Sequence, residues 1–384
     1  MSREGDREPG SSAVPVDRQR TSRRRLRPVL IGISVSLSTL VACDFVATAL
    51  LSSLGLYRPP ESYRVRHPVY HHGLEPMVSE RRAEWGRLRY RVSTSSLGMR
   101  DRAARVVPLH AQERRILLLG DSFTEGLGYD FEQTFAGRLA DALEGDGVEV
   151  LNGAAVSYSP IIYLAKTRHL LETVDLEIDR LVVCLDLSDV HDEARIYLPE
   201  IGEGGIRAID DRMERVRSFI RRRTILVNAL NQLNRRRRRA QEGLQLDVFR
   251  GRWAHDPAAM ELYGREGLRR AGRRLSELAA FLRERDVAMT LVVYPWPDQI
   301  ARRDRESIQV RHWRDWAAAE GAQFVDLFPV FLDAGPPGRV LRELFIPNDV
   351  HWNAEGHRLV AEELVAAIRA GLEQREAKAP ENAS

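Results

Sequence analysis

The sequence contains very little lysine. Lys166 and Lys378 are the only lysines among 384 residues, so nearly all of the positive charge is arginine, and the formal net charge is only +3. A nucleic-acid-binding protein would need a concentrated basic face, which this near-balance of charge does not suggest. The apolar content of 43% and the charged content of 29% are ordinary for a globular protein. We therefore expect no nucleic-acid partner.

Cysteine is equally scarce. Cys43 lies in an apolar N-terminal stretch and Cys184 in an expected core strand, so the two predict free thiols and no disulfide framework. A phosphate-binding loop is also missing, because the glycines of GDSFTEGLG (120–128) lack the lysine and the Ser or Thr that such a loop needs. No internal repeat is present. These absences leave an enzyme or binding protein without a cofactor as the expectation.

One long apolar run stands near the N-terminus. Residues 29–56 carry a single charge, Asp44, and exceed the roughly 20 residues that a helix needs to cross a bilayer. Eight arginines precede the run, whereas only Arg58, Arg64 and Arg66 occur in the ten residues after it. The positive-inside rule then predicts an uncleaved signal anchor in a bacterial inner membrane, with the N-terminus in the cytoplasm and the rest of the chain outside.

Two alternatives remain for this run. The string LVAC (40–43) resembles a bacterial lipoprotein cleavage box, which would make Cys43 a lipidated N-terminus, although apolar sequence continues for a dozen residues beyond it. A cleaved secretory signal would have a shorter apolar core. The signal anchor is favoured. The expected regions are a disordered cytoplasmic tail (1–28), the anchor (29–56), a connecting region (57–113), an α/β domain (114–373) and a disordered tail (374–384).

Short apolar runs alternate with helical patterns in the α/β domain. The runs at 115–119, 148–151, 180–185, 287–294 and 323–328 are typical of strands buried on both faces of a parallel sheet. Their alternation with helices predicts a doubly wound, flavodoxin-like sheet in a three-layer α/β sandwich. In such sheets the functional residues gather at the carboxyl ends of the strands.

The stretch 203–256 interrupts this alternation. Apolar residues at helical spacing and clustered arginines predict an inserted amphipathic helix with a basic face. Two interpretations stay open. The helix packs on the surface of the domain, or it touches an anionic membrane or an acidic polysaccharide.

A serine directly follows the first apolar run, in ILLLGDSFTEG (116–126). Asp121 and Ser122 could simply cap a helix that follows a strand. Alternatively, Ser122 is a nucleophile, which would need a base within hydrogen-bond reach and an acid that orients the base. Asp349 and His351 stand in a loop before the last helical pattern and could supply both.

These two blocks together resemble the signatures of the SGNH/GDSL hydrolases, in particular of membrane-anchored bacterial members. The GDS block at 120–122 matches the opening signature, and NDVHWNAEGH matches the closing one. The resemblance implies that Ser122 is the nucleophile, that His351 is the general base and that Asp349 orients it. His357 is a rival base, but its place inside the last helix indicates a structural role.

The resemblance covers roughly residues 65–372, well for the end blocks and loosely for 200–285, and it implies an oxyanion hole. Its donors would be the N–H of Ser122, an N–H from the second block, where Ser157 replaces the usual glycine, and the side chain of Ser188, which replaces the usual asparagine. Loss of one such donor typically lowers the rate about 100- to 1000-fold. The family commonly separates acid and histidine by two residues, which would place Asn348 at the acid position, but some anchored members share the shorter spacing of Asp349.

Two other clusters carry metal-ligating residue types. HPVYHHGLEP places His67, His71 and His72 near Glu75, and His residues at this spacing can ligate zinc. SDVHDE (188–193) follows a strand and is expected to line the rim of the site. No structural context supports a metal in either, so we expect neither a metal nor a cofactor.

The resemblance thus implies a serine esterase with its domain in the periplasm or at the cell exterior. It would remove an O-acyl group from a cell-envelope carbohydrate, or cleave another ester, through an acyl-Ser122 intermediate. The alternatives are an O-acyltransferase that uses the same triad and a non-catalytic envelope-assembly protein that keeps the fold. The sequence indicates neither the acyl group nor an oligomeric state.

Overall fold

The computed structural model describes residues 18–54, 56, 63–111, 113–197, 201–202, 205–206, 224–226, 229–230, 233 and 249–378. Most of the expected insertion 203–256 lies outside these residues. The chain divides into two compact units. One comprises Met1–Pro60 with Arg212–Asn234, and the other comprises Glu61–Asp211 with Arg235–Ser384.

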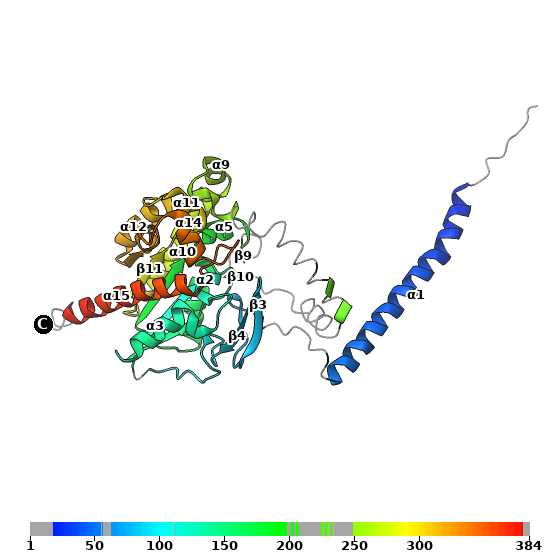
Figure 1. The fold of residues 1–384 in the computed structure, drawn as a ribbon, viewed down its shortest axis with the longest axis horizontal. Helices are drawn as coiled ribbons and strands as arrows, with labels where there is room; N and C mark the ends of the chain where they lie inside the picture. Colours follow the sequence, from blue (N-terminus) through cyan, green and yellow to red (C-terminus); the bar gives the residue numbers. More distant parts are fainter. Residues whose placement is uncertain are drawn as a thin grey trace, which may run out of the picture. The chain divides into compact units, whose positions relative to one another are not determined.

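The first unit is built on helix α1 (Arg18–Ser53), drawn in blue in Figure 1. Its stretch Ile31–Ser53 is long and apolar enough to cross a membrane. The helix begins at Arg18, inside the tail that was expected to be disordered, because the arginines and leucine of this stretch are good helix formers. Residues 1–17 of the expected tail lie outside the described part of the chain.

The second unit contains an eight-stranded sheet in the order β12-β11-β8-β6-β7-β5-β4-β3. Its parallel part follows the flavodoxin-like order 2-1-3-4-5, which confirms the predicted fold class. Every residue of β8 is buried, as expected for a central strand covered on both faces. The parallel strands are β6 (Arg114–Gly120), β7 (Val148–Asn152), β8 (Arg180–Leu185), β11 (Ala288–Val293) and β12 (Gln323–Asp326).

Helices cover both faces of this sheet and complete the three layers (Figure 1). On one face α3 (Phe135–Glu144) packs against α15 (Ala354–Lys378), and α15 runs five residues past the expected end of the domain. The other face carries α4 (Pro160–Arg168), α5 (Leu187–Arg195), α10 (Arg265–Arg283) and α12 (Ile308–Glu320). The shorter helices are α2 (Ser122–Glu125), α9 (Pro257–Ala259), α11 (Pro297–Arg302), α13 (Phe328–Asp333) and α14 (Pro337–Leu344).

The expected connecting region 57–113 supplies three strands of the sheet. Strands β3 (Arg81–Trp85), β4 (Leu88–Thr94) and β5 (Arg100–Asp101) extend it in antiparallel fashion, and β5 pairs with β7. The buried Arg100 guanidinium donates to the carbonyl groups of Glu125, at the end of α2, and of Gly126 and Tyr129 in the loop that follows. These hydrogen bonds join the antiparallel strands to the loop after α2. Two small hairpins complete the unit, β1 (Arg64–His67) with β2 (His71–Leu74) and β9 (Ile201–Gly202) with β10 (Gly205–Ile206).

Candidate active site

Ser122 lies at the sharp turn between β6 and α2. Asp121 is the N-cap of α2, and its Oδ1 accepts the N–H of Phe123 at 2.9 Å. A Cβ atom at Gly120 would lie 2.1 Å from the hydroxyl of Thr124, so the close turn requires glycine there. The two interpretations of this stretch therefore apply to different residues. Asp121 caps the helix, and the side chain of Ser122 is available for another contact.

The structure brings Ser122, His351 and Asp349 together. His351 Nε2 is 2.8 Å from Ser122 Oγ, and His351 Nδ1 is 2.5 Å from Asp349 Oδ1. Asp349 Oδ1 also accepts the backbone N–H of His351 at 3.0 Å, which holds the two residues in a tight turn. A histidine that donates Nδ1–H to a carboxylate presents the lone pair of Nε2 to the serine hydroxyl.

Trp85 supports this arrangement from strand β3. Its Nε1–H donates to Asp349 Oδ2 at 2.8 Å, and its ring meets His351 edge-on with 5.1 Å between the centroids. Burial acts to raise the pKa of Asp349, but hydrogen bonds, first from His351 and then from Trp85, outweigh it and lower the pKa below its usual value. Sequence analysis missed Trp85, and its place beside Gly86 in a hairpin turn was the only available signal.

His357, the rival base, lies in the core instead. Its Nδ1 accepts the backbone N–H of Phe135 at 3.2 Å, and its ring stacks on that of Phe135. Burial, and then the charge of Arg100, lower its pKa to about 3, so it stays neutral at physiological pH. This geometry agrees with the structural role expected for it.

The predicted backbone donors of the oxyanion hole are the N–H groups of Ser122 and Ser157. Ser122 is the first residue of α2, and Ser157 has a left-handed backbone with φ of 60°. Among the described residues, none accepts a hydrogen bond from either N–H. The adjacent Val156 N–H donates to Glu125 Oε2 at 2.9 Å, and the Ser157 carbonyl accepts the hydroxyl of Tyr197. The loop that carries Ser157 is thus held from both sides.

Ser188 is directed to a neighbouring carboxylate. Its N–H donates to Asp186 Oδ1 at 2.6 Å. Trp296 Nε1 donates to the other oxygen of Asp186 at 2.7 Å. A role for the Ser188 side chain as third oxyanion donor stays a prediction.

Comparison with protein families decides the assignment of the domain. Residues 256–383, which include Asp349 and His351, match the family model described as SGNH hydrolase-like domain, acetyltransferase AlgX. These residues belong to an SGNH hydrolase-like domain, and we call the α/β domain that contains them the SGNH domain.

Several solved structures are similar to part of this chain. They include TesA (13% identity, 67% of this chain and 99% of that chain, TM-score 0.40). The acetylxylan esterase Axe2 from Geobacillus stearothermophilus matches at 13% identity over 68% of this chain and 96% of its own, with a TM-score of 0.38. The psychrotrophic esterase EstA from Pseudoalteromonas sp. matches at 11% identity over 68% and 100%, also at 0.38. No curated protein matches the sequence.

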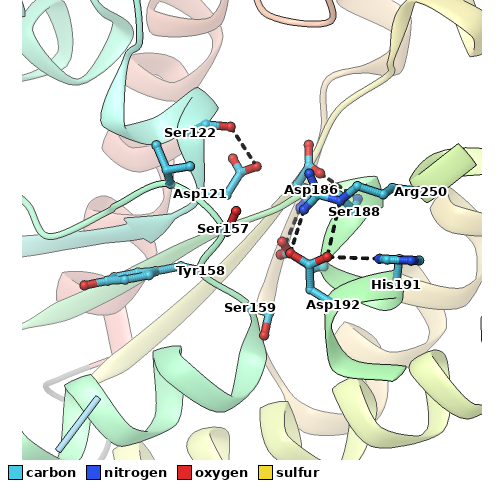
Figure 2. Close-up of polar contacts among 12 residues, drawn as sticks. Asp121, Ser122, Ser157, Tyr158, Ser159, Asp186, Ser188, His191, Asp192 and Arg250 are labelled. Carbon is cyan, nitrogen blue, oxygen red and sulfur yellow. Dashed lines mark hydrogen bonds and ion pairs between the residues drawn. The ribbon is translucent and has the colours of Figure 1, made fainter. Parts of the chain in front are cut away.

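Three buried carboxylates lie beside the serine of the SGNH domain. Ligand oxygens of Asp121, Asp186 and Asp189 all lie within 4.8 Å of one another. Burial, and then the charge of Asp186, raise the pKa of Asp121 to about 7, and burial also raises the pKa values of Asp186 and Asp189. Asp121 Oδ2 is 3.2 Å from Ser122 Oγ (Figure 2), so an ionised Asp121 competes with His351 for the serine proton.

The stretch 188–193, expected on the rim of the site, forms the start of α5 in the SGNH domain. Within it, the fully buried Asp192 accepts two hydrogen bonds from Arg250, at 3.2 and 2.6 Å. His191 Nδ1 lies 3.1 Å from the same carboxylate (Figure 2). These contacts are structural and join α5 to the chain that returns from the insertion.

The histidine cluster of the sequence lies on the β1–β2 hairpin. His71 Nδ1 and His72 Nδ1 are 2.6 Å apart, His72 Nε2 donates to a backbone carbonyl, and Glu75 pairs with Arg81. Burial lowers the pKa values of His67 and His72 to about 4. In the described ranges, the ligand atoms of these four residues do not converge as those of the three aspartates do.

Proposed function

We propose that the SGNH domain is a serine esterase that removes O-acyl groups from carbohydrate through an acyl-Ser122 intermediate. The observation that carries this proposal is the pair of hydrogen-bond contacts that His351 makes, with Asp349 at 2.5 Å and with Ser122 at 2.8 Å. Ser122 is 9% exposed and His351 is 6% exposed, so the polar contacts are sheltered from bulk water. Electrostatic interactions are stronger in such a site.

The reaction follows from this geometry. His351 Nε2 accepts the proton of Ser122 Oγ as the oxygen attacks the acyl carbonyl, while Asp349 stabilises the imidazolium. The N–H groups of Ser122 and Ser157 bind the developing oxyanion. His351 then protonates the departing alkoxide. In the second half, it takes a proton from water, which attacks the acyl-enzyme and releases the acid.

The test is reaction with an activated phosphonate or with p-nitrophenyl acetate. The wild type should be labelled on Ser122 and show a burst of nitrophenol. Ser122→Ala should show neither, and His351→Ala should lose at least about 100-fold of the rate. Absence of labelling in a folded wild-type protein would reject this proposal in favour of a non-catalytic envelope-assembly protein.

Acyl transfer is the second candidate. It is favoured by the description of the matched family model, which names an acetyltransferase. The same acyl-Ser122 would then pass its acyl group to a sugar hydroxyl instead of water. Partition of acetyl between free acetate and an added oligosaccharide distinguishes the two. Acetylated sugar as the main product indicates a transferase, whereas acetate unaffected by the sugar indicates an esterase.

We also propose that the domain is anchored in the bacterial inner membrane and acts outside the cytoplasm on cell-envelope carbohydrate. The support is the candidate span Ile31–Ser53 and the eight arginines that precede residue 29. An anchored enzyme outside the cytoplasm meets acylated envelope glycans without a separate binding module.

A further inference from the structure

Asp44 is the single charge in the long apolar run, and the structure gives it a partner. Its carboxylate accepts the backbone N–H groups of Ile225 and Leu226, both at 3.0 Å. Thr48, one turn later on α1, accepts the N–H of Ile225 at 3.0 Å as well and is 3% exposed. Two distant parts of the first unit therefore meet through polar contacts on one face of α1.

The partner segment is the apolar centre of the insertion, residues 224–233, which we call the insertion segment. Its described residues after Thr224 are helical. The side chains of Leu226, Leu230 and Leu233 are exposed. Spacings of four and three residues place these leucines on one side of a helix.

The contact solves two problems that would each be costly in a membrane. An isolated carboxylate in hydrocarbon is unfavourable. The first N–H groups of a helix lack partners within the helix and carry partial positive charge. When Asp44 accepts two of these N–H groups, the charge and the donors satisfy each other. Half-helices in membranes commonly direct their N-termini to anions in this way.

The exposed side chains around the contact match a lipid environment. On α1, Val46, Leu50 and Leu54 are exposed, as are the leucines of the insertion segment. An outward apolar surface around an internal polar contact is the arrangement expected in a bilayer, where water does not drive the pairing. In the sequence, arginine runs at 221–223 and 235–239 flank the segment, a composition that favours lipid headgroups.

The candidate span places the contact in the outer half of the bilayer. The middle of Ile31–Ser53 is residue 42, so Asp44 lies two residues beyond it and nine residues before the outer end of the span. Each residue of a helix adds about 1.5 Å, which places Asp44 about 3 Å beyond the middle of the span on its outer side. Arginine side chains that flank the insertion segment can extend along apolar surface toward the headgroups.

We propose that the insertion segment enters the outer leaflet and is held there against α1 by Asp44 and Thr48. The inference rests on α1 crossing the bilayer and is independent of the reaction at Ser122. It selects the membrane over the surface of the SGNH domain as the place of the insertion segment. The chain is thus attached to the membrane at two points, the N-terminal anchor and the middle of the insertion.

Disulfide formation in the full-length protein tests the contact. In a Cys43→Ser background, Thr48→Cys combined with Ile225→Cys should crosslink on oxidation in membranes. A protease site inserted after the exposed Ala103 makes the product visible, because the two fragments then stay joined only by the disulfide. The matched control is Thr39→Cys with Ile225→Cys. Thr39, like Thr48, donates its hydroxyl to a carbonyl four residues earlier. Because Thr39 is exposed, this pair should not crosslink.

Removal of the carboxylate should weaken the contact. Asp44→Leu should lower the crosslinking of the 48–225 pair at least about five-fold, the loss typical of a missing helix cap. Asp44→Asn keeps one acceptor oxygen and should give an intermediate yield. Equal yields for the 48–225 and 39–225 pairs, or no crosslink in either, would overturn the docking.

A fluorescent probe tests the lipid environment. Leu230→Cys, labelled with an environment-sensitive fluorophore, should show blue-shifted emission in vesicles of phosphatidylethanolamine and phosphatidylglycerol. Lipids that carry a doxyl group on the acyl chain should quench this emission. Emission typical of water, or no quenching, would overturn membrane entry even if the crosslink forms. Release of the full chain by alkaline extraction would remove the anchor on which the inference rests, whatever the labelling of Ser122.

Discussion

The hydrogen bond from Trp85 to Asp349 links an N-terminal hairpin to the proposed triad. Trp85→Phe keeps an aromatic ring against His351 but removes the donor. We expect kcat to fall about ten-fold with little change in KM, because a hydrogen bond to a charged acceptor contributes about 1.5–3 kcal/mol. The pH profile should shift as the pKa of Asp349 rises. Steady-state kinetics across pH measure both, and an unchanged kcat would contradict a positioning role.

The raised pKa of Asp121 predicts that the stability of the folded protein depends on pH. In the folded state its pKa is raised to about 7 from 3.8, so the folded protein holds this proton where the unfolded chain has released it. Below about pH 4 this proton makes its full contribution to the free energy of unfolding. The contribution is lost as pH rises from about 4 through 7, at up to about 1.4 kcal/mol per pH unit. Asp121→Asn, which can still cap α2, should flatten this slope.

Thermal unfolding at several pH values measures the slope. The control is Asp175→Asn, at an exposed aspartate whose left-handed backbone asparagine tolerates. A slope identical in the wild type and in Asp121→Asn would show that Asp121 does not carry this titration.

Among single residues, the sequence was sufficient to predict the site residues that belong to short motifs. Ser122 and the pair Asp349 and His351 stand at junctions of strand and helix, where side chains gather at one edge of a sheet. Trp85 could not be found in the same way, because its contact spans 264 positions and no motif marks it. The engagement of Ser188 by Asp186 depends on side-chain geometry, which spacing does not determine.

At the scale of elements, helix α5 and the returning end of the insertion are joined by a buried ion pair. Asp192 is fully buried, and Arg250 retains only 17% of its side-chain exposure. Arg250→Met would leave the carboxylate buried without its guanidinium. We expect a loss of about 3 kcal/mol in the free energy of unfolding, as is typical when one partner of a buried pair is removed.

Chemical denaturation followed by tryptophan fluorescence measures this loss. Arg269→Met is the matched control, because Arg269 pairs with Glu266 on an exposed face of α10, where such pairs contribute at most about 1 kcal/mol. Equal effects of the two substitutions would contradict a special role for Arg250.

The elements of the parallel sheet were predictable because continuous apolar runs mark strands that are buried on both faces. The hairpin β3–β4 was harder to assign. Strand β3 alternates half-buried and exposed residues, as an antiparallel edge does, and this pattern is weaker than a continuous apolar run. The pairing of β5 with β7 shows that this hairpin belongs to the sheet.

At the scale of the whole molecule, the arginine bias around α1 predicts an orientation. A reporter that is active only outside the cytoplasm, fused after residue 60, should give a signal, whereas a cytoplasmic reporter at the same point should be silent. Replacing the arginines at 23–25 and Arg27 by glutamine should lower the signal of the external reporter, because the positive-inside bias is then largely lost. A signal from the cytoplasmic reporter in the wild type would reverse the proposed topology.

The separation of Ser122 and His351 by 229 positions also has a consequence for the timing of synthesis. At 5–20 residues per second, a ribosome makes the serine roughly 10–50 s before its histidine. In the proposed mechanism, a nascent chain therefore carries an unactivated hydroxyl until His351 has been added, and any product that ends before His351 lacks the base. The order of the residues along the chain thus delays the proposed acyl chemistry until His351 has been synthesised.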